Sequence, residues 1–400
     1  MDLAQIDLCN PQLFVPSVPH ELFAELRRTS PVFWHEEEGG VGFWSVMGYH
    51  DLVAVNRDSS TFSSYKGGAL MMNWDDEILA QQRLMMLNMD PPMHTRYRRL
   101  VNKGFTPRMV HELEDRIVER TRELIDSAKD KGEFDFVSDI AAELPLQVIA
   151  ELMGIPQEDR HKVFDWSNRM VGSNDPEFLE APELATAAAM ELFAYADGLT
   201  VERKANPHDD LVSILAHAEI EGDRLDQLEI DMFFMLLAVA GNETTRNLLS
   251  HGMLALMENP DERRKLIERP ELLESAIEEM LRYASPVMHF RRTATRDTEI
   301  GGQHVAEGDK VIFWHASANR DEAVFDDPDR FDIGRSPNDH VAFGGGGSHF
   351  CLGANLARLE IRVMFTEILR EMPALELSGD VQRLCSNFIN GIKHLPVAVG

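Results

Sequence analysis

A glycine tract that leads into a cysteine constrains the fold of this chain more than any other segment. The run Phe343-Gly-Gly-Gly-Gly-Ser-His-Phe-Cys351-Leu-Gly353 is followed by ANLARLEIRVMF, which has helical periodicity. Glycines allow the backbone to pass close to a large flat ligand. A helix that begins just beyond Cys351 places its positive dipole end near the sulfur, which lowers the pKa of the thiol. The segment therefore predicts a loop that presents a cysteine thiolate to a bound group.

Two kinds of bound group suit such a loop. A thiolate that binds a haem iron as its axial ligand pushes electron density toward bound oxygen, and this favours cleavage of the O–O bond. Phosphate is the alternative, because glycine-rich loops before helices also bind nucleotides. Here no Gly-Lys-Ser/Thr follows the glycines, and Asn338-Asp-His-Val-Ala stands where a nucleotide-binding loop has its strand. The pattern therefore favours haem.

Composition excludes several classes of partner. The chain has 400 residues, of which 44% are hydrophobic, and a formal charge of −29, which argues against nucleic acid and anionic membranes. Cys9, Cys351 and Cys385 are too few and too far apart for a disulfide framework and suit a reducing compartment. The N-terminal residues have neither a basic region nor a long apolar run. We expect a cytoplasmic monomer without a membrane anchor.

The order of the predicted elements indicates a mainly α chain with small β-sheets, an α+β fold. Apolar residues recur at helical spacing over most of 108–201 and over 225–257, where Asn259-Pro260 ends the pattern. We expect one domain over residues 1–400, with small sheets near both ends. The other predicted elements are helices at Pro19–Arg27 and Glu271–Tyr283, and strand signals at Val32–Trp34, Val41–Met47, Met288–Thr293, Glu299–His304 and Lys310–Trp314, with turns at Gly301-Gly302 and Glu307-Gly308.

The long central helix contains an unusual sequence, Ala240-Gly-Asn-Glu-Thr-Thr245. Glycine and threonine are unfavourable within a helix, so some other interaction must compensate. Small residues leave room for a ligand, and a threonine hydroxyl can bond a carbonyl of the preceding turn and bend the axis. The acid and alcohol pair, Glu243 and Thr244, can relay protons into a dry pocket. Alternatively, the segment is a weak point in a core helix with Glu243 on the solvated face.

A third pattern is Glu279-Met-Leu-Arg282, in which the acid and the guanidinium share one helical face. The segment Asp327-Pro-Asp-Arg330 supplies a second guanidinium for the same carboxylate. Taken alone, this pattern is typical of a surface ion pair, which contributes little stability.

Together, and in this order, the three motifs resemble those of the cytochrome P450 superfamily of haem-thiolate monooxygenases. The resemblance covers essentially the whole chain. It implies the family's triangular, mostly helical fold and a haem b cofactor, iron protoporphyrin IX, bound between the long central helix and the cysteine loop. It also implies insertion of one oxygen atom of dioxygen into an unactivated C–H bond of a hydrophobic substrate.

The resemblance also implies roles for individual residues. Cys351 would be the axial thiolate, and Glu243 and Thr244 would deliver protons to bound oxygen. The remaining implied residues are Ala240, Gly241 and Gly353 beside the haem, His94, Arg98, Arg292 and His349 at its propionates, and Glu279, Arg282 and Arg330 as a structural triad. Charge-assisted bonds from Arg and His suit two buried carboxylates. Arg291 competes with Arg292, and we prefer Arg292 because its spacing to Asp297 fits the family pattern.

The cysteine loop departs from the family pattern in one respect. The usual aromatic residue stands seven positions before the cysteine, where this chain has Gly344, and Phe343 stands eight before. Gly347 and His349 keep their usual spacing. The sequence leaves open whether Phe343 or Phe350 packs on the thiolate side of the haem.

Three segments, 286–299, 343–347 and 386–397, resemble a bacterial branch that oxidises steroid side chains, branched lipids and terpenoids. Few of the candidate pocket residues are polar, and methionines suit an adaptable apolar pocket. The predicted pocket residues are Met71, Met72, Trp74, Met85, Met86, Phe234, Leu237, Ala238, Val287, Met288 and Phe388.

No flavin- or nucleotide-binding module is apparent in the sequence, so we expect a ferredoxin and a ferredoxin reductase to donate electrons. Arg96, Arg98, Arg99 and Lys103 form a local basic cluster that suits a small acidic ferredoxin. Two other functions remain open: a haem-thiolate peroxygenase or isomerase that needs no external electrons, and a non-enzymatic haem or lipid carrier. The Glu243–Thr244 pair argues against the first, and the small residues Ala240 and Gly241, which leave one haem face open, argue against the second.

Overall fold

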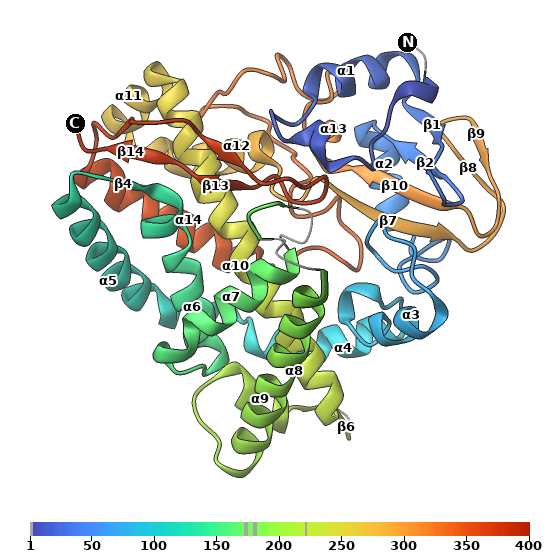
Figure 1. Cartoon of the computed structure of the whole chain (residues 1–400), viewed down its shortest axis with the longest axis horizontal. Helices are drawn as coiled ribbons and strands as arrows, with labels where there is room; N and C mark the ends of the chain where they lie inside the picture. The colour runs from blue at the N-terminus through green and yellow to red at the C-terminus, as the bar shows by residue number, and fades with distance from the viewer. Residues whose placement is uncertain (1–2, 172–174, 179–181, 221) are drawn as a thin grey trace.

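A long helix, α10 (Gln227–Glu258), runs through the middle of the protein. The structure, a computed structural model, describes residues 3–171, 175–178, 182–220 and 222–400. The Asp226 side chain accepts a bond from the Glu229 amide, and the Glu229 side chain accepts one from the Asp226 amide, so a capping box starts the helix. It ends at Asn259, before Pro260. Figure 1 shows α10 crossing a roughly triangular outline, as the resemblance predicts.

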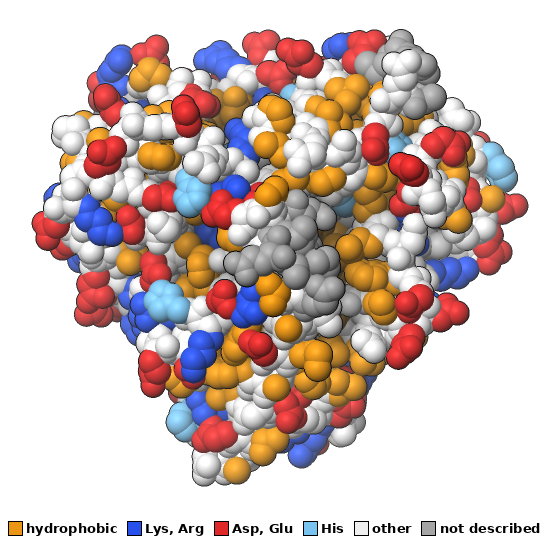
Figure 2. Space-filling view, in the orientation of Figure 1, with side chains coloured by type: hydrophobic (Ala, Val, Ile, Leu, Met, Phe, Trp, Pro, Cys, Tyr) orange, Lys and Arg blue, Asp and Glu red, His pale blue; other side chains and the backbone are white. Residues whose placement is uncertain are grey.

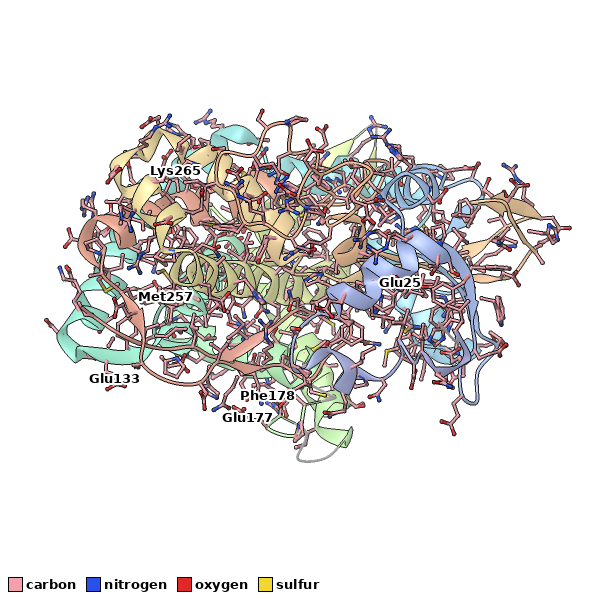
Figure 3. The ribbon with its side chains drawn as sticks, turned by 90° about the horizontal axis from the view of Figure 1, so that it is seen from above. Glu25, Glu133, Glu177, Phe178, Met257 and Lys265 are labelled. Atoms are coloured by element: carbon pink, nitrogen blue, oxygen red, sulfur yellow. The ribbon has the colours of Figure 1, made fainter. Side chains whose placement is uncertain are left out.

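Helices pack against α10 from several directions, with α6, α8 and α12 among its neighbours. In Figure 3, Lys265 lies on one side of α10, whereas Glu133 and Glu177 lie on the other. The other helices are α1 (His20–Thr29), α2 (Tyr49–Arg57), α3 (Asp76–Gln82), α4 (Met93–Val101), α5 (Pro107–Lys131), α6 (Glu143–Met153), α7 (Arg160–Val171), α8 (Pro182–Ala205), α9 (Leu211–His217), α11 (Pro260–Glu268), α12 (Leu273–Ala284), α13 (His315–Ala318) and α14 (Ala354–Glu371).

The largest sheet among the described residues has five strands in the order β1-β2-β10-β7-β3, in which only the β2–β10 pair is parallel. Residues 298–305 form a hairpin that turns at Gly301 and Gly302, where the sequence predicts a turn, and both glycines adopt positive φ angles. The strands are β1 (Val32–His35), β2 (Phe43–Val46), β3 (Phe62–Ser63), β4 (Glu133–Asp135), β5 (Glu219–Ile220), β6 (Asp223–Arg224), β7 (His289–Ala294), β8 (Thr298–Ile300), β9 (Gln303–Val305), β10 (Lys310–Trp314), β11 (Glu376–Leu377), β12 (Gln382–Arg383), β13 (Ile392–His394) and β14 (Pro396–Ala398).

The five-stranded sheet separates two hydrophobic cores. Ile312 and Trp314 on β10 pack with N-terminal residues such as Phe14, whereas Val311 and Phe313 face the opposite core. Strand β7 pairs with β10 in antiparallel register, and its side chains alternate between the same two faces. Phe290 and Arg292 therefore share a face with Phe313, and His289 and Arg291 share the other with Trp314.

Acidic side chains are scattered over the face in Figure 2, in keeping with the formal charge of −29. Among the described residues, no helix combines the length and the apolar character needed to cross a bilayer.

Candidate functional site

The cysteine loop folds back over the C-terminal end of α2. Gly344, Gly346 and Gly347 have φ angles of 94°, 93° and 80°, which L side chains rarely adopt. A Cβ atom on Gly347 would lie only 2.8 Å from the Asn56 carbonyl oxygen. The Cys351 amide donates to the Phe343 carbonyl at 3.0 Å and closes the loop on itself. The glycine run is thus required by turn geometry and by close packing on α2.

Two side chains at the end of α2 fasten this loop. The Asn56 amide nitrogen donates to the Gly346 carbonyl at 3.0 Å, and the Arg57 Nε donates to the Gly345 carbonyl at 2.9 Å. The Asn56 Oδ1 accepts a bond from Arg292 Nη2 at 3.0 Å. Asn56 therefore connects the cysteine loop with β7.

The Cys351 thiol lies in a buried environment just before α14. Burial raises the pKa of this thiol, although the Gly353 amide and the charges of Arg98 and Arg358 act in the opposite direction. The sequence predicted a lowered pKa, and this prediction was wrong for the protein alone because the loss of solvation outweighs the Gly353 amide and the two guanidinium charges. A metal ion bound to the sulfur would deprotonate the thiol.

A cavity with an empty volume of about 1500 Å³, partly open to solvent, lies between the cysteine loop and α10. Apolar side chains make up most of its wall. Its lining residues are Asn56, Met86, Leu87, His94, Arg98, Phe105, Ile149, Phe233, Leu236, Leu237, Ala240, Gly241, Thr244, Thr245, Leu248, Leu281, Pro286, Val287, Phe290, Arg292, His315, Ala342, Phe343, Gly344, His349, Phe350, Cys351, Leu352, Gly353, Leu356, Ala357 and Glu360.

The polar part of the wall is rich in positive charge and imidazole. In the described part of the chain, no carboxylate lies within ion-pair distance of Arg98 or Arg292, and both ring nitrogens of His94 lack a hydrogen-bond partner. Burial, with a contribution from Arg98, lowers the pKa of His94 to about 4, and burial lowers the pKa of Arg292 to about 10. Unpaired buried donors of this kind suit an anionic ligand.

Helix α10 forms a wall of the cavity with small residues. The Thr244 hydroxyl donates to the Ala240 carbonyl at 2.7 Å, which is the bond to the preceding turn that the sequence suggested. Gly241 lines the cavity, but a Cβ atom there would lie 2.5 Å from Ile149 Cδ1 on α6. Packing of α6 against α10 therefore favours glycine at this position, since a larger residue would have to displace the Ile149 side chain.

Glu243 is buried and faces away from the cavity. It forms an ion pair with Arg246 on the same helix, and Arg246 donates to Asn168 of α7 at 2.9 Å. Its Oε1 atom has no hydrogen-bond partner. Burial raises the pKa of Glu243 despite the charge of Arg246. Glu243 is thus neither a solvated surface residue nor, in this conformation, part of the cavity wall.

The predicted triad needs a correction in its third member. Arg282 binds Glu279 through two bonds of 2.8 Å, and both side chains are fully buried. The second guanidinium belongs to Arg335, whose Nε lies 3.2 and 3.1 Å from the two Glu279 oxygens. Arg330 instead lies 4.0 Å from Asp332, because the chain turns so that the carbonyl of Arg330 faces Arg282.

Comparison with known families agrees with this arrangement. The model of the family described as Cytochrome P450 matches residues 10–383. This chain belongs to the cytochrome P450 family. It is a haem-dependent monooxygenase, and its fold is the one that the resemblance predicted.

Relatives of known activity span nearly the whole chain. A steroid C26-monooxygenase from Rhodococcus jostii is 44% identical over 98% of this chain and 84% of its own length. A methyl-branched lipid omega-hydroxylase from Mycobacterium tuberculosis is 44% identical over 94% of this chain and 90% of its own. A linalool 8-monooxygenase from Pseudomonas putida is 41% identical over 98% of each.

Solved P450 structures are also similar. A Mycobacterium marinum cytochrome P450 in complex with pseudoionone superposes with a TM-score of 0.92 at 40% identity, with 98% of each chain covered. In the present P450, the residues around the cavity fit haem b on their own evidence. One wall carries a single cysteine and the rest is mostly apolar. One region offers the guanidinium groups of Arg98 and Arg292, which have no carboxylate partner among the described residues, and the His94 imidazole for the two haem carboxylates.

Several predicted pocket residues do not reach the cavity. Of the predicted set, only Met86, Leu237 and Val287 line it. Met71 and Met288 pack in the N-terminal core, Phe234 and Ala238 in the core around α10, and Met72 is 52% exposed. Trp74 and Met85 are half-buried but are not among the residues that line the cavity. Phe388 does not line it either and packs against Phe290. The physical reason is that side chains next to each other on a strand or helix point in different directions.

Some cavity residues were missed by sequence reasoning. Phe290 was recoverable, because it is two residues from Arg292 and therefore on the same face of β7. Asn56, His315 and Glu360 carried no such signal. Of the two aromatic residues left open, Phe343 is half-buried beneath the Arg358 guanidinium at 4.6 Å, whereas Phe350 is 41% exposed.

The basic cluster on α4 and the turn after it is largely engaged within the protein. Arg96 binds Asp223 and Glu229 at 2.6 Å each, and Lys103 donates to the Glu219 carbonyl at 2.7 Å. Arg98 lines the cavity. The predicted docking surface is therefore reduced, since Arg96 is neutralised by two carboxylates of its own chain.

Proposed function

We propose that this P450 hydroxylates a bulky apolar molecule at or near the end of a branched aliphatic chain, with Cys351 as the iron ligand. The observation that supports this most is the apolar wall beside α10. Met86, Leu236, Leu237, Val287 and Phe290 line it and offer no charged group to a substrate. An apolar substrate gains affinity there from burial, and a polar one loses solvation without compensation.

We infer that the haem carboxylates are bound by His94, Arg98, Arg292 and His349, with Ala240, Gly241 and Gly353 next to the macrocycle. A bound haem would supply the redox chemistry that activates dioxygen. The Thr244 hydroxyl lies on the cavity wall and holds a proton at its Oγ1 through the bond to Ala240. Glu243 would replenish that proton only after its ion pair with Arg246 opens.

The names of the relatives support the substrate class: a steroid, a methyl-branched lipid and linalool. We propose a steroid side chain, a branched lipid or a terpenoid as the substrate. Electrons would come from a ferredoxin and its reductase.

The test compares two neighbouring residues in the segment that enters β7. Val287 lines the cavity, whereas Met288 is buried in the core on the other face of the sheet. Sterols, terpenoids and methyl-branched fatty acids are titrated into the ferric protein, and products are mapped by mass spectrometry. We expect terminal hydroxylation in the wild type, oxidation further along the chain in Val287→Ala, and unchanged position in Met288→Ala.

Binding of small polar aromatic compounds, without a spectral response to any sterol, terpenoid or fatty acid, would contradict the proposal. Equal product distributions in all three proteins would remove Val287 from the control of position.

A further inference from the structure

His315 is a cavity residue to which neither the family motifs nor the proposed chemistry gives a role. It follows β10 directly and begins α13. By strand alternation it shares a face with Phe313, which pairs with Phe290 of β7, and it lines the cavity together with Phe290 and Arg292. Its ring makes edge contacts with Phe290 at 5.8 Å and with Phe313 at 5.4 Å. These contacts fix the plane of the imidazole at the cavity wall.

Among the described residues, the imidazole of His315 has no hydrogen-bond partner. Both Nδ1 and Nε2 are buried and unpaired, and the residue is only 2% exposed. Burial, with the charge of Arg292, lowers the pKa of His315 to about 3, so the ring is neutral with one N–H donor and one acceptor. Buried polar groups in proteins nearly always have a partner, which points to a ligand atom in the cavity.

The neighbouring charge identifies the chemistry of that ligand. Arg292 donates to the Arg291 carbonyl and to Asn56, and within the described residues no carboxylate lies at ion-pair distance from its guanidinium. A negatively charged ligand oxygen beside Arg292 would both neutralise the guanidinium and accept a hydrogen bond from the His315 N–H. Haem b carries two such carboxylates, whereas the proposed substrates present hydrocarbon to the wall.

We propose that His315 donates a hydrogen bond to the haem carboxylate that Arg292 binds, and so positions the cofactor. This inference rests on the haem site described above. The opposite face of the same sheet offers a control, His289, whose two ring nitrogens are also buried and unpaired. His289 packs against Trp314 at 4.7 Å and Phe388 at 5.5 Å and does not line the cavity.

The first experiment measures the rate of haem transfer from the holoprotein to excess apomyoglobin. We expect His315→Phe to release haem about tenfold faster, because a hydrogen bond to a charged group is lost. His315→Gln keeps an N–H donor and should stay within about threefold of the wild type. His289→Phe should release haem at the wild-type rate.

The second experiment repeats the comparison after reconstitution with haem dimethyl ester, which lacks the carboxylate charges. The effect of His315→Phe should then disappear, which a purely structural role would not produce. Release of native haem by His315→Phe at the wild-type rate would overturn the proposal, as would the same acceleration with the ester as with native haem. Failure of the wild type to bind haem would instead contradict the haem site itself.

Discussion

At the scale of single residues, two opposing effects act on the Cys351 thiol. Burial raises its pKa, while the Gly353 amide and two nearby guanidinium groups favour the thiolate. Cys9 is a poor substitute, because burial and the charges of Glu37 and Asp7 raise the pKa of its thiol to about 11.

We expect Cys351→Ser to abolish the thiolate signature while the chain still folds. The hydroxyl is too weak an acid to replace a thiolate as the iron ligand. The spectrum of the reduced, carbon-monoxide-bound protein measures this, with Cys9→Ser as a control that keeps the signature. A red-shifted carbon-monoxide band in Cys351→Ser would assign the ligand to Cys9 or Cys385.

Thr244→Ala should uncouple turnover, because the cavity wall formed by α10 loses the hydroxyl that holds a proton there. Product formation should fall by about 10²-fold while reduced cofactor is still consumed and ends as peroxide or water. The ratio of product to cofactor consumed is the measurement. Thr366→Ala is the matched control, since Thr366 makes the same bond to the preceding turn at 2.7 Å on an exposed part of α14. Equal coupling in both variants would remove Thr244 from proton delivery.

Glu360 makes the stability of the protein depend on pH. It is buried at the cavity wall, and burial raises its pKa from 4.5 to about 8. At pH values between 4.5 and 8, Glu360 loses its proton in the unfolded chain and keeps it in the folded protein. The free energy of unfolding therefore falls as pH rises through this range. Below pH 4.5 both states are protonated, and the effect is absent.

The stability of Glu360→Gln relative to the wild type should therefore rise by about 3.5 kcal/mol between pH 5 and pH 8, since one pKa unit corresponds to about 1.4 kcal/mol. Urea unfolding at the two pH values measures this. Glu376→Gln on the exposed strand β11 is the control and should change neither value by more than about 0.5 kcal/mol. If the free energy of unfolding depended on pH in the same way in the wild type and in Glu360→Gln, the raised pKa of Glu360 would be contradicted.

At the scale of elements, buried ion pairs hold α12 to the chain that leads into the cysteine loop. Glu279 receives Arg282 from its own helix and Arg335 from beyond the helix, together with Asn338 at 3.2 Å. Arg335 also donates to the carbonyls of Asp326 and Asp327. One guanidinium therefore joins the helix to the whole turn.

The two candidate arginines give a direct test. Arg335→Ala should lower the free energy of unfolding by about 2–4 kcal/mol and reduce haem retention, because a buried carboxylate loses one of its two cations. Arg330→Ala should change the free energy of unfolding by no more than about 0.5 kcal/mol, since the Arg330 side chain is 61% exposed. Urea unfolding and haem content after dialysis measure both. A larger effect from Arg330 would restore the sequence-based triad.

At the scale of the whole molecule, the charge distribution bears on the electron donor. A formal charge of −29 would repel the acidic ferredoxin that we propose as the donor over most approaches, so we propose that a local basic surface guides it. Reversal at Arg96 is a poor test, because it would place a third acid beside Asp223 and Glu229 and disturb the fold. Arg99 lies on the same helix, α4, with its side chain exposed.

Arg99→Glu should slow the first electron transfer from ferredoxin by about tenfold at low ionic strength and weaken its dependence on salt. Substrate affinity should stay unchanged. Stopped-flow reduction across a salt series measures the rate. Arg264→Glu makes the same charge change on α11, where the side chain is 65% exposed, and should have little effect. Equal rates in the two variants at every salt concentration would place the docking surface elsewhere.

The sequence by itself determined the features that are encoded locally. Positive-φ glycines before Cys351, the capping box of α10 and the alternation of β7 follow from residues close together in the chain. For this reason the family, the fold class, the cysteine loop and the choice of Arg292 over Arg291 as a cavity residue were all predictable.

Tertiary structure alone decided which distant groups meet. Arg335 rather than Arg330 reaches Glu279, Arg246 joins its partner Glu243 to Asn168 of α7, and Asp223 and Glu229 neutralise Arg96. His315 and Arg292 line one cavity, although 22 residues separate them along the chain. The physical reason is that burial and charge pairing depend on neighbours brought together by folding, and a local pattern of residues specifies conformation and face but not partner.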